Sequence, residues 1–112
     1  MQSVTLNKMI DKLELKNLVP EVETDGIEIN SPDINRPALQ LAGYFAHFAS
    51  ERVQIIGYVE YTYLKSLPRE EKLHNYERFL SSELPCVIFS SRTKPDEDMI
   101  LLARKYKKPL LH

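Results

Sequence analysis

The sequence has few of the residues on which many catalytic and metal-binding motifs depend. It contains three glycines, one cysteine and no tryptophan among 112 residues. A phosphate-binding loop or a dinucleotide-binding turn needs clustered glycines, so that backbone amides can approach phosphate oxygens. Gly26, Gly43 and Gly57 are too far apart for either motif. A single cysteine excludes a disulfide framework and a CxxC redox pair, and the three histidines lack an HxxxH or HxH spacing for a metal site.

The sequence also lacks an excess of positive or negative charge, and it has no long apolar run. Lys plus Arg number 15 and Asp plus Glu number 16, so the formal net charge is -1. This balance gives no electrostatic reason to expect nucleic acid or an anionic membrane as a partner. No run approaches the roughly 20 apolar residues of a membrane-spanning helix. With 43% hydrophobic residues, the sequence predicts one folded domain over residues 1–112, in the reducing cytoplasm that its cysteine usage favours.

The first half of the chain shows short and interrupted patterns. The hydroxyl of Thr5 is placed to cap a helix whose apolar residues recur at helical spacing. A proline interrupts the β-rich segment that follows, which predicts an edge strand or a strand end there. The expected elements are a strand-like pair at 3–4, a helix over 6–13, an edge strand within 15–22, a strand over 26–30 and a short helix from Pro37.

Strands alternate with helices in the second half. We expect strands at 53–57, 85–90 and 109–111, with helices within 58–67, over 69–81 and from Pro95 onward. This alternation favours β-α-β connections. The predicted fold class is therefore α/β, a single domain with a mostly parallel or mixed sheet flanked by helices. The last strand begins where the given sequence stops, which favours a cut at a domain boundary.

Three groups of side chains could carry chemistry, and each has a structural alternative. Cys86 lies in an apolar run, and a buried apolar role is favoured over a nucleophilic one. His47 lies in an aromatic stretch that either contacts a ligand or packs on the core, and packing is favoured. Tyr58, Tyr61 and Tyr63 follow a predicted strand together with Glu60, in a place where open α/β sheets often bind ligands. A partly buried helix with tyrosines at its surface boundary is the favoured alternative.

Asp33 and Arg36 form another candidate pair just before the helix at Pro37. They either form a local ion pair that holds the turn or face a ligand or another domain. An exposed pair of this kind contributes only about 0–1 kcal/mol, so the spacing leaves both alternatives open.

Five segments together resemble a known family. Residues 31–45, SPDINRPALQLAGYF, closely resemble the stretch sDInRPgLeLaGyf of the amino-terminal domain of HPr kinase/phosphorylase. ERVQIIG at 51–57 is similar to that family's eRiQllG strand, and EYTYL at 60–64 resembles its next helix. PCVIFS at 85–90 and KKPLL at 107–111 resemble two later strands. Ala38 and Lys107 stand where the family commonly has glycine, so the helix end at Lys107 is expected to be less tightly wound.

The resemblance implies a part in the regulation of bacterial sugar use. The family phosphorylates a serine of the protein HPr with ATP or pyrophosphate and also removes that phosphate. Its phosphate-binding loop, Mg²⁺ ligands and catalytic acid belong to a second domain downstream, so ATP and Mg²⁺ are expected there. No catalytic, cofactor-binding or metal residue of the family can be carried onto this sequence. The expected partners are its own catalytic domain, other subunits of the parent oligomer and, through the parent protein, HPr; nucleic acid and membrane are not expected.

The amino-terminal domain of the family is similar in fold to those of some Mur ligases, which bind uridine nucleotides. Two functions follow from the resemblance. The first is a non-catalytic role in assembly or regulation, within carbon catabolite repression, with residues 33–44 as the contact surface. The alternative is a module that senses a small ligand, a nucleotide or a metabolite. The residues expected at the interaction surface are Asp33, Asn35, Arg36, Tyr44 and Tyr61.

Overall fold

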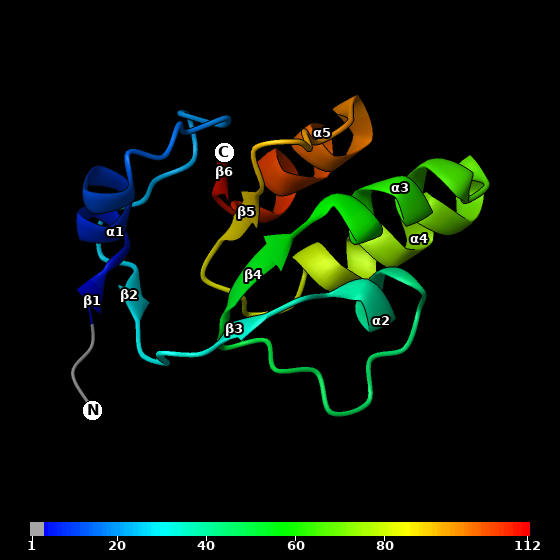
Figure 1. The fold of residues 1–112 in the computed structure, drawn as a ribbon, viewed down its shortest axis with the longest axis horizontal. Helices are drawn as coiled ribbons and strands as arrows, with labels where there is room; N and C mark the ends of the chain where they lie inside the picture. The colour runs from blue at the N-terminus through cyan, green and yellow to red at the C-terminus, as the bar shows by residue number, and fades with distance from the viewer. Residues whose placement is uncertain (1–3) are drawn as a thin grey trace.

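A four-stranded parallel sheet forms the centre of the fold in the computed structural model, which describes residues 4–112 (Figure 1). Its strands are β3 (Ile34–Asn35), β4 (Val53–Ile56), β5 (Val87–Phe89) and β6 (Leu110–Leu111), side by side in that order. All three neighbouring pairs are parallel. Parallel neighbours need crossover connections, and helices supply them here. The predicted α/β fold with a parallel sheet is confirmed.

Four helices lie between the strands and cover one face of this sheet. They are α2 (Ala38–Leu41), α3 (Tyr58–Ser66), α4 (Arg69–Leu80) and α5 (Glu97–Tyr106). Leu41, Phe79 and Met99 from these helices are fully buried in the large hydrophobic cluster. Ile56 and Phe89 of the sheet belong to the same cluster. The main core therefore lies between the sheet and the four helices.

Residues 4–15 and 27–29 cover the other face. Strands β1 (Val4–Thr5) and β2 (Glu28–Ile29) form an antiparallel pair, and α1 (Leu6–Leu13) follows β1 directly. A second cluster joins Leu6 and Ile29 to Val53, Cys86 and Leu111. Successive side chains of a strand point to opposite faces. Strands β4, β5 and β6 therefore contribute side chains to both clusters.

Side chains cap the starts of two helices, and the sequence predicts the first of these caps, at Thr5. The hydroxyl of Thr5 accepts a hydrogen bond from the Lys8 amide at the start of α1. At the start of α5, the carboxylate of Asp96 accepts one from the Met99 amide at 2.9 Å. The same carboxylate accepts bonds from Lys72 Nζ at 2.7 Å and from the Tyr76 hydroxyl at 3.0 Å. Asp96 thus joins the start of α5 to α4.

The expectation that the helix end at Lys107 is loosely wound is wrong. Lys107 takes the left-handed conformation, with φ 56°, that glycine adopts most readily. The Lys108 amide donates to the Ala103 carbonyl at 2.8 Å, which closes the helix as in a Schellman motif. A lysine therefore supports a wound helix end without the help of glycine.

Two strand expectations need correction in the first half. Residues 15–22 form no strand, but contribute one isolated bridge between Asn17 and Leu111. Val19 and Val22 pack into the large cluster instead. Their apolar side chains are therefore explained by burial in the core and not by strand pairing. The strand expected over 26–30 is confirmed only as the shorter β2. Of the pair expected at 3–4, Val4 belongs to β1, and Ser3 lies outside the described residues.

Candidate functional site

Three amide side chains form a network where β3 and β4 lie side by side. Asn35 Nδ2 donates to Gln54 Oε1 at 2.7 Å and to Gln40 Oε1 at 3.2 Å. Gln54 is completely buried in β4, and its own Nε2 donates to the carbonyls of Ala49 and Arg52 at 3.1 and 2.8 Å. Buried polar groups are stable only when they are hydrogen-bonded. This network therefore holds α2 and the loop before β4 against the sheet.

Next to these amides, one carboxylate gathers three donors at the carboxyl ends of β3 and β4. Glu60 is buried, with 5% of its side chain exposed, and Arg36 Nε and Nη2 donate to its Oε1 at 3.2 and 2.9 Å. The Gly57 amide donates to the same oxygen at 2.6 Å. A side chain at position 57 would overlap the Arg36 guanidinium. Arg36, Gly57 and Glu60 therefore form one structural unit that ties the approach to α2 to the start of α3.

The alternative of a local ion pair between Asp33 and Arg36 is wrong. Arg36 reaches Glu60, which is 24 residues further along the chain. Asp33 remains exposed, and Arg52 Nη2 lies 3.9 Å from its carboxylate. The parallel pairing of β3 and β4 explains the difference, because it brings the ends of both strands to the same edge of the sheet.

Apolar side chains are exposed on the two helices that this unit connects. Leu39 on α2 is 61% exposed and Val59 on α3 is 68% exposed, while Tyr44 and Tyr63 are also exposed. The two helices are in contact with each other. We name Leu39, Tyr44, Val59 and Tyr63 the α2–α3 surface. Because the two helices are in contact, we take this surface as the candidate region for contact with another protein.

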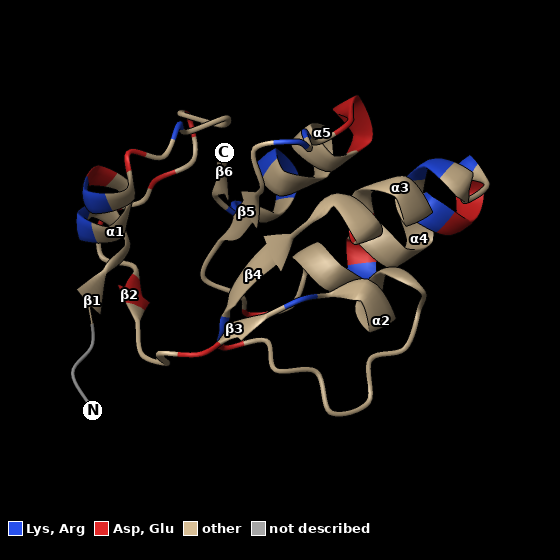
Figure 2. Ribbon diagram, viewed as in Figure 1, with Lys and Arg blue, Asp and Glu red and all other residues tan. Residues whose placement is uncertain are grey.

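A hollow of about 550 Å³ lies at the carboxyl ends of β5 and β6. Four of the lining side chains are basic: Lys16, Arg92, Lys94 and His112. The remaining lining residues are Leu18, Tyr61, Ser91, Thr93, Pro95 and Ile100. Figure 2 shows basic residues in the segment that leads into α5, while acidic residues appear in the first turn of that helix. We name this feature the carboxyl-edge hollow.

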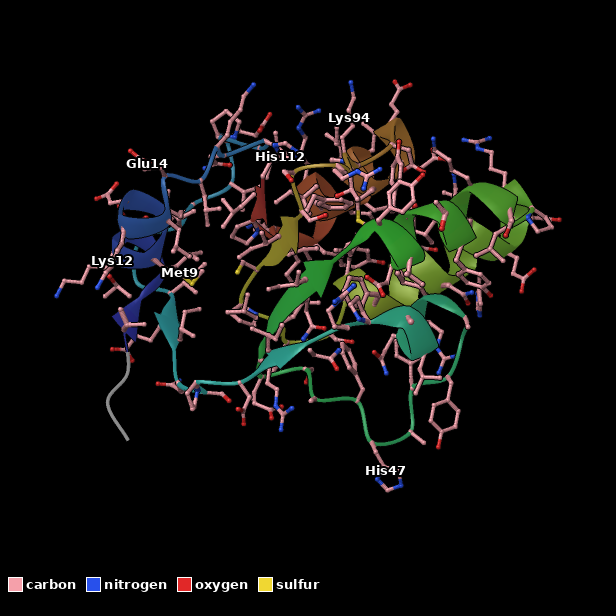
Figure 3. All side chains as sticks on the ribbon, viewed as in Figure 1. Met9, Lys12, Glu14, His47, Lys94 and His112 are labelled. Atoms are coloured by element: carbon pink, nitrogen blue, oxygen red, sulfur yellow. The ribbon has the colours of Figure 1, made fainter. Side chains whose placement is uncertain are left out.

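The aromatic stretch before β4 divides between core and solvent. Phe48 packs against Phe45 and Phe79, with ring centroids 5.8 Å apart in both pairs. Packing is therefore confirmed for the phenylalanines. It is wrong for His47, whose exposed side chain points away from the fold (Figure 3).

Cys86 is completely buried, as expected. Burial raises the pKa of its thiol to about 12. Only the thiolate attacks a disulfide reagent, so the thiol is protonated and unreactive at pH 8.

We expect a coloured aromatic disulfide reagent to modify the native chain at pH 8 at least about a thousandfold more slowly than the unfolded chain, whose thiol pKa is near the free value of about 8.5. The absorbance of the released thiol measures both rates, and Cys86 is the only thiol in the sequence. Equal rates with and without denaturant would contradict the buried position.

The described residues give no indication of a metal centre or of a membrane span. Within residues 4–112, no three His, Cys, Asp or Glu side chains gather closely enough to hold a metal ion. Over the same residues, no helix has the length and apolar character needed to cross a membrane.

Comparison with known proteins identifies the residues of these sites as part of a shared domain. Residues 4–112 match the family described as HPr Serine kinase N terminus. The chain belongs to this family. The match covers the whole part of the chain that the structure describes, including the amide network, the Arg36–Glu60 pair and both surfaces.

Several HPr kinase/phosphorylases are similar to this HPr kinase amino-terminal domain. The protein of Lachnoclostridium phytofermentans is 41% identical over 98 residues, which are 88% of this chain and 32% of the relative. The protein of Alkaliphilus metalliredigens is 37% identical over 111 residues, 99% of this chain and 36% of the relative. That of Caldicellulosiruptor bescii is 41% identical over 110 residues, 96% of this chain and 34% of the relative. The chain thus spans about a third of the length of these relatives.

Within this HPr kinase amino-terminal domain, the five residues expected at an interaction surface have different surroundings. Asn35 and Arg36 are engaged in the internal contacts described above. Asp33 and Tyr44 are exposed, while Tyr61 lines the carboxyl-edge hollow and has Lys65 Nζ 4.5 Å from its ring centroid. Their part in binding stays a prediction.

Sequence reasoning overlooked other residues of both sites. Gln54 could have been found as a polar residue inside an otherwise apolar segment. Lys16, Arg92 and Lys94 carry no such signal, because they are far apart in the sequence and only the fold brings them together.

Proposed function

We propose that this chain is the non-catalytic amino-terminal domain of a bifunctional HPr serine kinase/phosphorylase, and that it acts in assembly or regulation. Membership of the family supports the first part, because the relatives are HPr kinase/phosphorylases about three times as long as the aligned segment. The parent protein phosphorylates a serine of HPr and removes that phosphate, in the control of carbon catabolite repression in the bacterial cytoplasm. Its ATP and Mg²⁺ bind in a catalytic domain outside this chain.

The α2–α3 surface is the contact region in this proposal. Its partners are the catalytic domain and other subunits of the parent oligomer, with HPr reached through the parent protein and no part for nucleic acid or membrane. The observation that carries the proposal is the exposure of Leu39 and Val59 beside a rigid unit. Arg36 and Glu60 fix the entry to α2 and the start of α3, so the two apolar side chains are presented by an ordered support.

A second candidate function is the sensing of a small ligand at the carboxyl-edge hollow. Ligands of open α/β sheets bind outside the carboxyl ends of the strands, and this hollow lies at that edge. Its volume of about 550 Å³ is in the range of small-molecule sites.

The assembly proposal is tested in a chimera, in which this chain replaces the matching 98 residues of the Lachnoclostridium phytofermentans protein. We expect the chimera to form the same oligomer as that relative and to phosphorylate HPr. The double variant Leu39→Ser, Val59→Ser is expected to weaken subunit association, or the ligand response of the kinase, by about thirtyfold, because apolar anchors at interfaces contribute more than about 1 kcal/mol each. Light scattering and HPr phosphorylation measure the two effects.

Leu101→Ser is the matched control, since Leu101 on α5 is 53% exposed but lies outside the α2–α3 surface. It is expected to leave assembly and activity unchanged. The proposal is wrong if the double variant behaves like this control, or if the 112-residue chain alone transfers phosphate from ATP to HPr.

A further inference from the structure

We propose that the carboxyl-edge hollow binds a phosphorylated small molecule, of a size up to that of a mononucleotide. The inference rests on the second candidate function, the sensing of a small ligand, and is independent of the assembly proposal. It adds the chemical class of the ligand and the side chains that recognise it.

The charge of the hollow is the first argument. Lys16, Arg92 and Lys94 line it together with His112, and no Asp or Glu of residues 4–112 is among its lining residues. The whole chain has a net charge of -1, so the gathering of basic side chains at this hollow is a local property of the fold. Within the described residues, none of the three basic side chains forms an ion pair with a carboxylate. Their charges are therefore available to an anion that enters from solvent.

The position of the nearest acid supports the same conclusion. Asp96 lies one residue beyond Pro95, but its carboxylate is bonded to Lys72, to the Tyr76 hydroxyl and to the Met99 amide. The acid is thus occupied at the start of α5. It is not left to neutralise Lys94.

The segment that carries Arg92 and Lys94 is held at both ends. At its beginning, the Ser90 amide donates to the Ile56 carbonyl at 3.0 Å, and the buried Thr93 hydroxyl donates to the Ser90 carbonyl at 2.9 Å. At its end, Asp96 joins the segment to α4. A pre-formed backbone lowers the entropy lost when a ligand binds.

Arg92 is also oriented within this segment. Its guanidinium carbon lies 4.7 Å from the centroid of the Tyr58 ring. Stacking uses the flat face of a guanidinium and leaves the N–H groups at its edge free to bind phosphate oxygens in pairs.

The opposite end of the hollow anchors Lys16 beside the sheet. The amides of Lys16 and His112 each donate to the carbonyl of the other residue at 2.9 Å. Basic groups from the first segment and from the loop before α5 therefore surround the same space. Figure 3 labels Lys94 and His112 at this edge, with Lys12 on α1 well away from both.

The apolar part of the lining sets the kind of molecule that fits. Leu18, Tyr61 and Ile100 give one part of the hollow a surface suited to a sugar or a ring, next to the basic side chains. At about 550 Å³ the space is larger than a phosphate ion needs. The ligand class is therefore a phosphate monoester with an organic part.

The test titrates adenosine monophosphate, with adenosine as the uncharged probe, into the chain at low ionic strength. A carboxyl-terminal amide removes the terminal negative charge that His112 would otherwise add to the hollow. We expect saturable changes in the amide signals of residues 16–18 and 91–95 with the monophosphate, and none with adenosine. The double variant Arg92→Gln, Lys94→Gln is expected to weaken binding by about tenfold, since both charge-assisted hydrogen bonds are lost.

Lys12→Gln removes one positive charge at a distance from the hollow and is the matched control. It is expected to keep the wild-type affinity. Equal affinity in the double variant and this control would overturn the inference, as would the lack of a saturable change at millimolar monophosphate. Equal binding of adenosine and its monophosphate would overturn the inference that the ligand is a phosphate monoester, but would leave the proposed sensing of a small ligand in place. The chimera tests the assembly proposal separately.

Discussion

Replacement of Gln54 by leucine is expected to lower the free energy of unfolding by about 2–4 kcal/mol, because several buried polar groups lose their partners at once. Gln54 accepts a bond from Asn35 and donates to the carbonyls of Ala49 and Arg52. Leucine has a similar volume and leaves little cavity. The decrease in the free energy of unfolding therefore measures the contribution of the hydrogen bonds. Urea unfolding followed by circular dichroism measures it.

Asn30→Leu is the matched control for this change. Asn30 is exposed, so the same exchange of an amide for an apolar side chain is expected to change the free energy of unfolding by less than about 0.5 kcal/mol. A Gln54→Leu variant as stable as this control would show that the amide network contributes nothing to the fold.

The second large effect is expected at Gly57, through a side chain that is distant in sequence. Gly57→Ala is expected to lower the free energy of unfolding by about 1–3 kcal/mol, because the methyl group displaces Arg36 and leaves the buried Glu60 carboxylate short of donors. The backbone itself gives no reason for a loss, since φ is -97° at Gly57, a value that any residue adopts. Thermal and urea unfolding of the single variants and the double variant measure the effect.

The double variant separates this mechanism from a general loss of packing. Arg36→Ala alone removes the same pair, so the alanine at position 57 is expected to cost less once Arg36 is absent. We expect a coupling free energy of about 1 kcal/mol or more between the two sites. Strictly additive losses would contradict the proposed displacement of Arg36.

Local patterns in the sequence predicted much of the second half of the fold. The alternation of apolar strands and amphipathic helices depends on neighbouring residues that can be compared directly. The segment over 15–22 shows the limit of such patterns. Val19 and Val22 are apolar because they fill the core, and no local signal separates that role from strand pairing.

The candidate sites depended on contacts that sequence spacing does not reveal. Arg36 has an acidic neighbour at Asp33, yet its partner is Glu60, because parallel strands bring their carboxyl ends together. The carboxyl-edge hollow similarly combines Lys16 with Arg92 and Lys94. Three of the segments that resemble the family contain the residues of the amide network and of the Arg36–Glu60 pair.

The two edges of the four-stranded sheet differ in how their backbone groups are covered, and this difference affects self-association. The segment around Asn17 pairs with β6 and occupies that edge. The other edge is β3, which has only two residues and is followed closely by Pro37, whose nitrogen cannot donate a hydrogen bond. Short edge strands and proline discourage strand addition from another chain. Strand addition from another chain is therefore disfavoured at both edges of the four-stranded sheet.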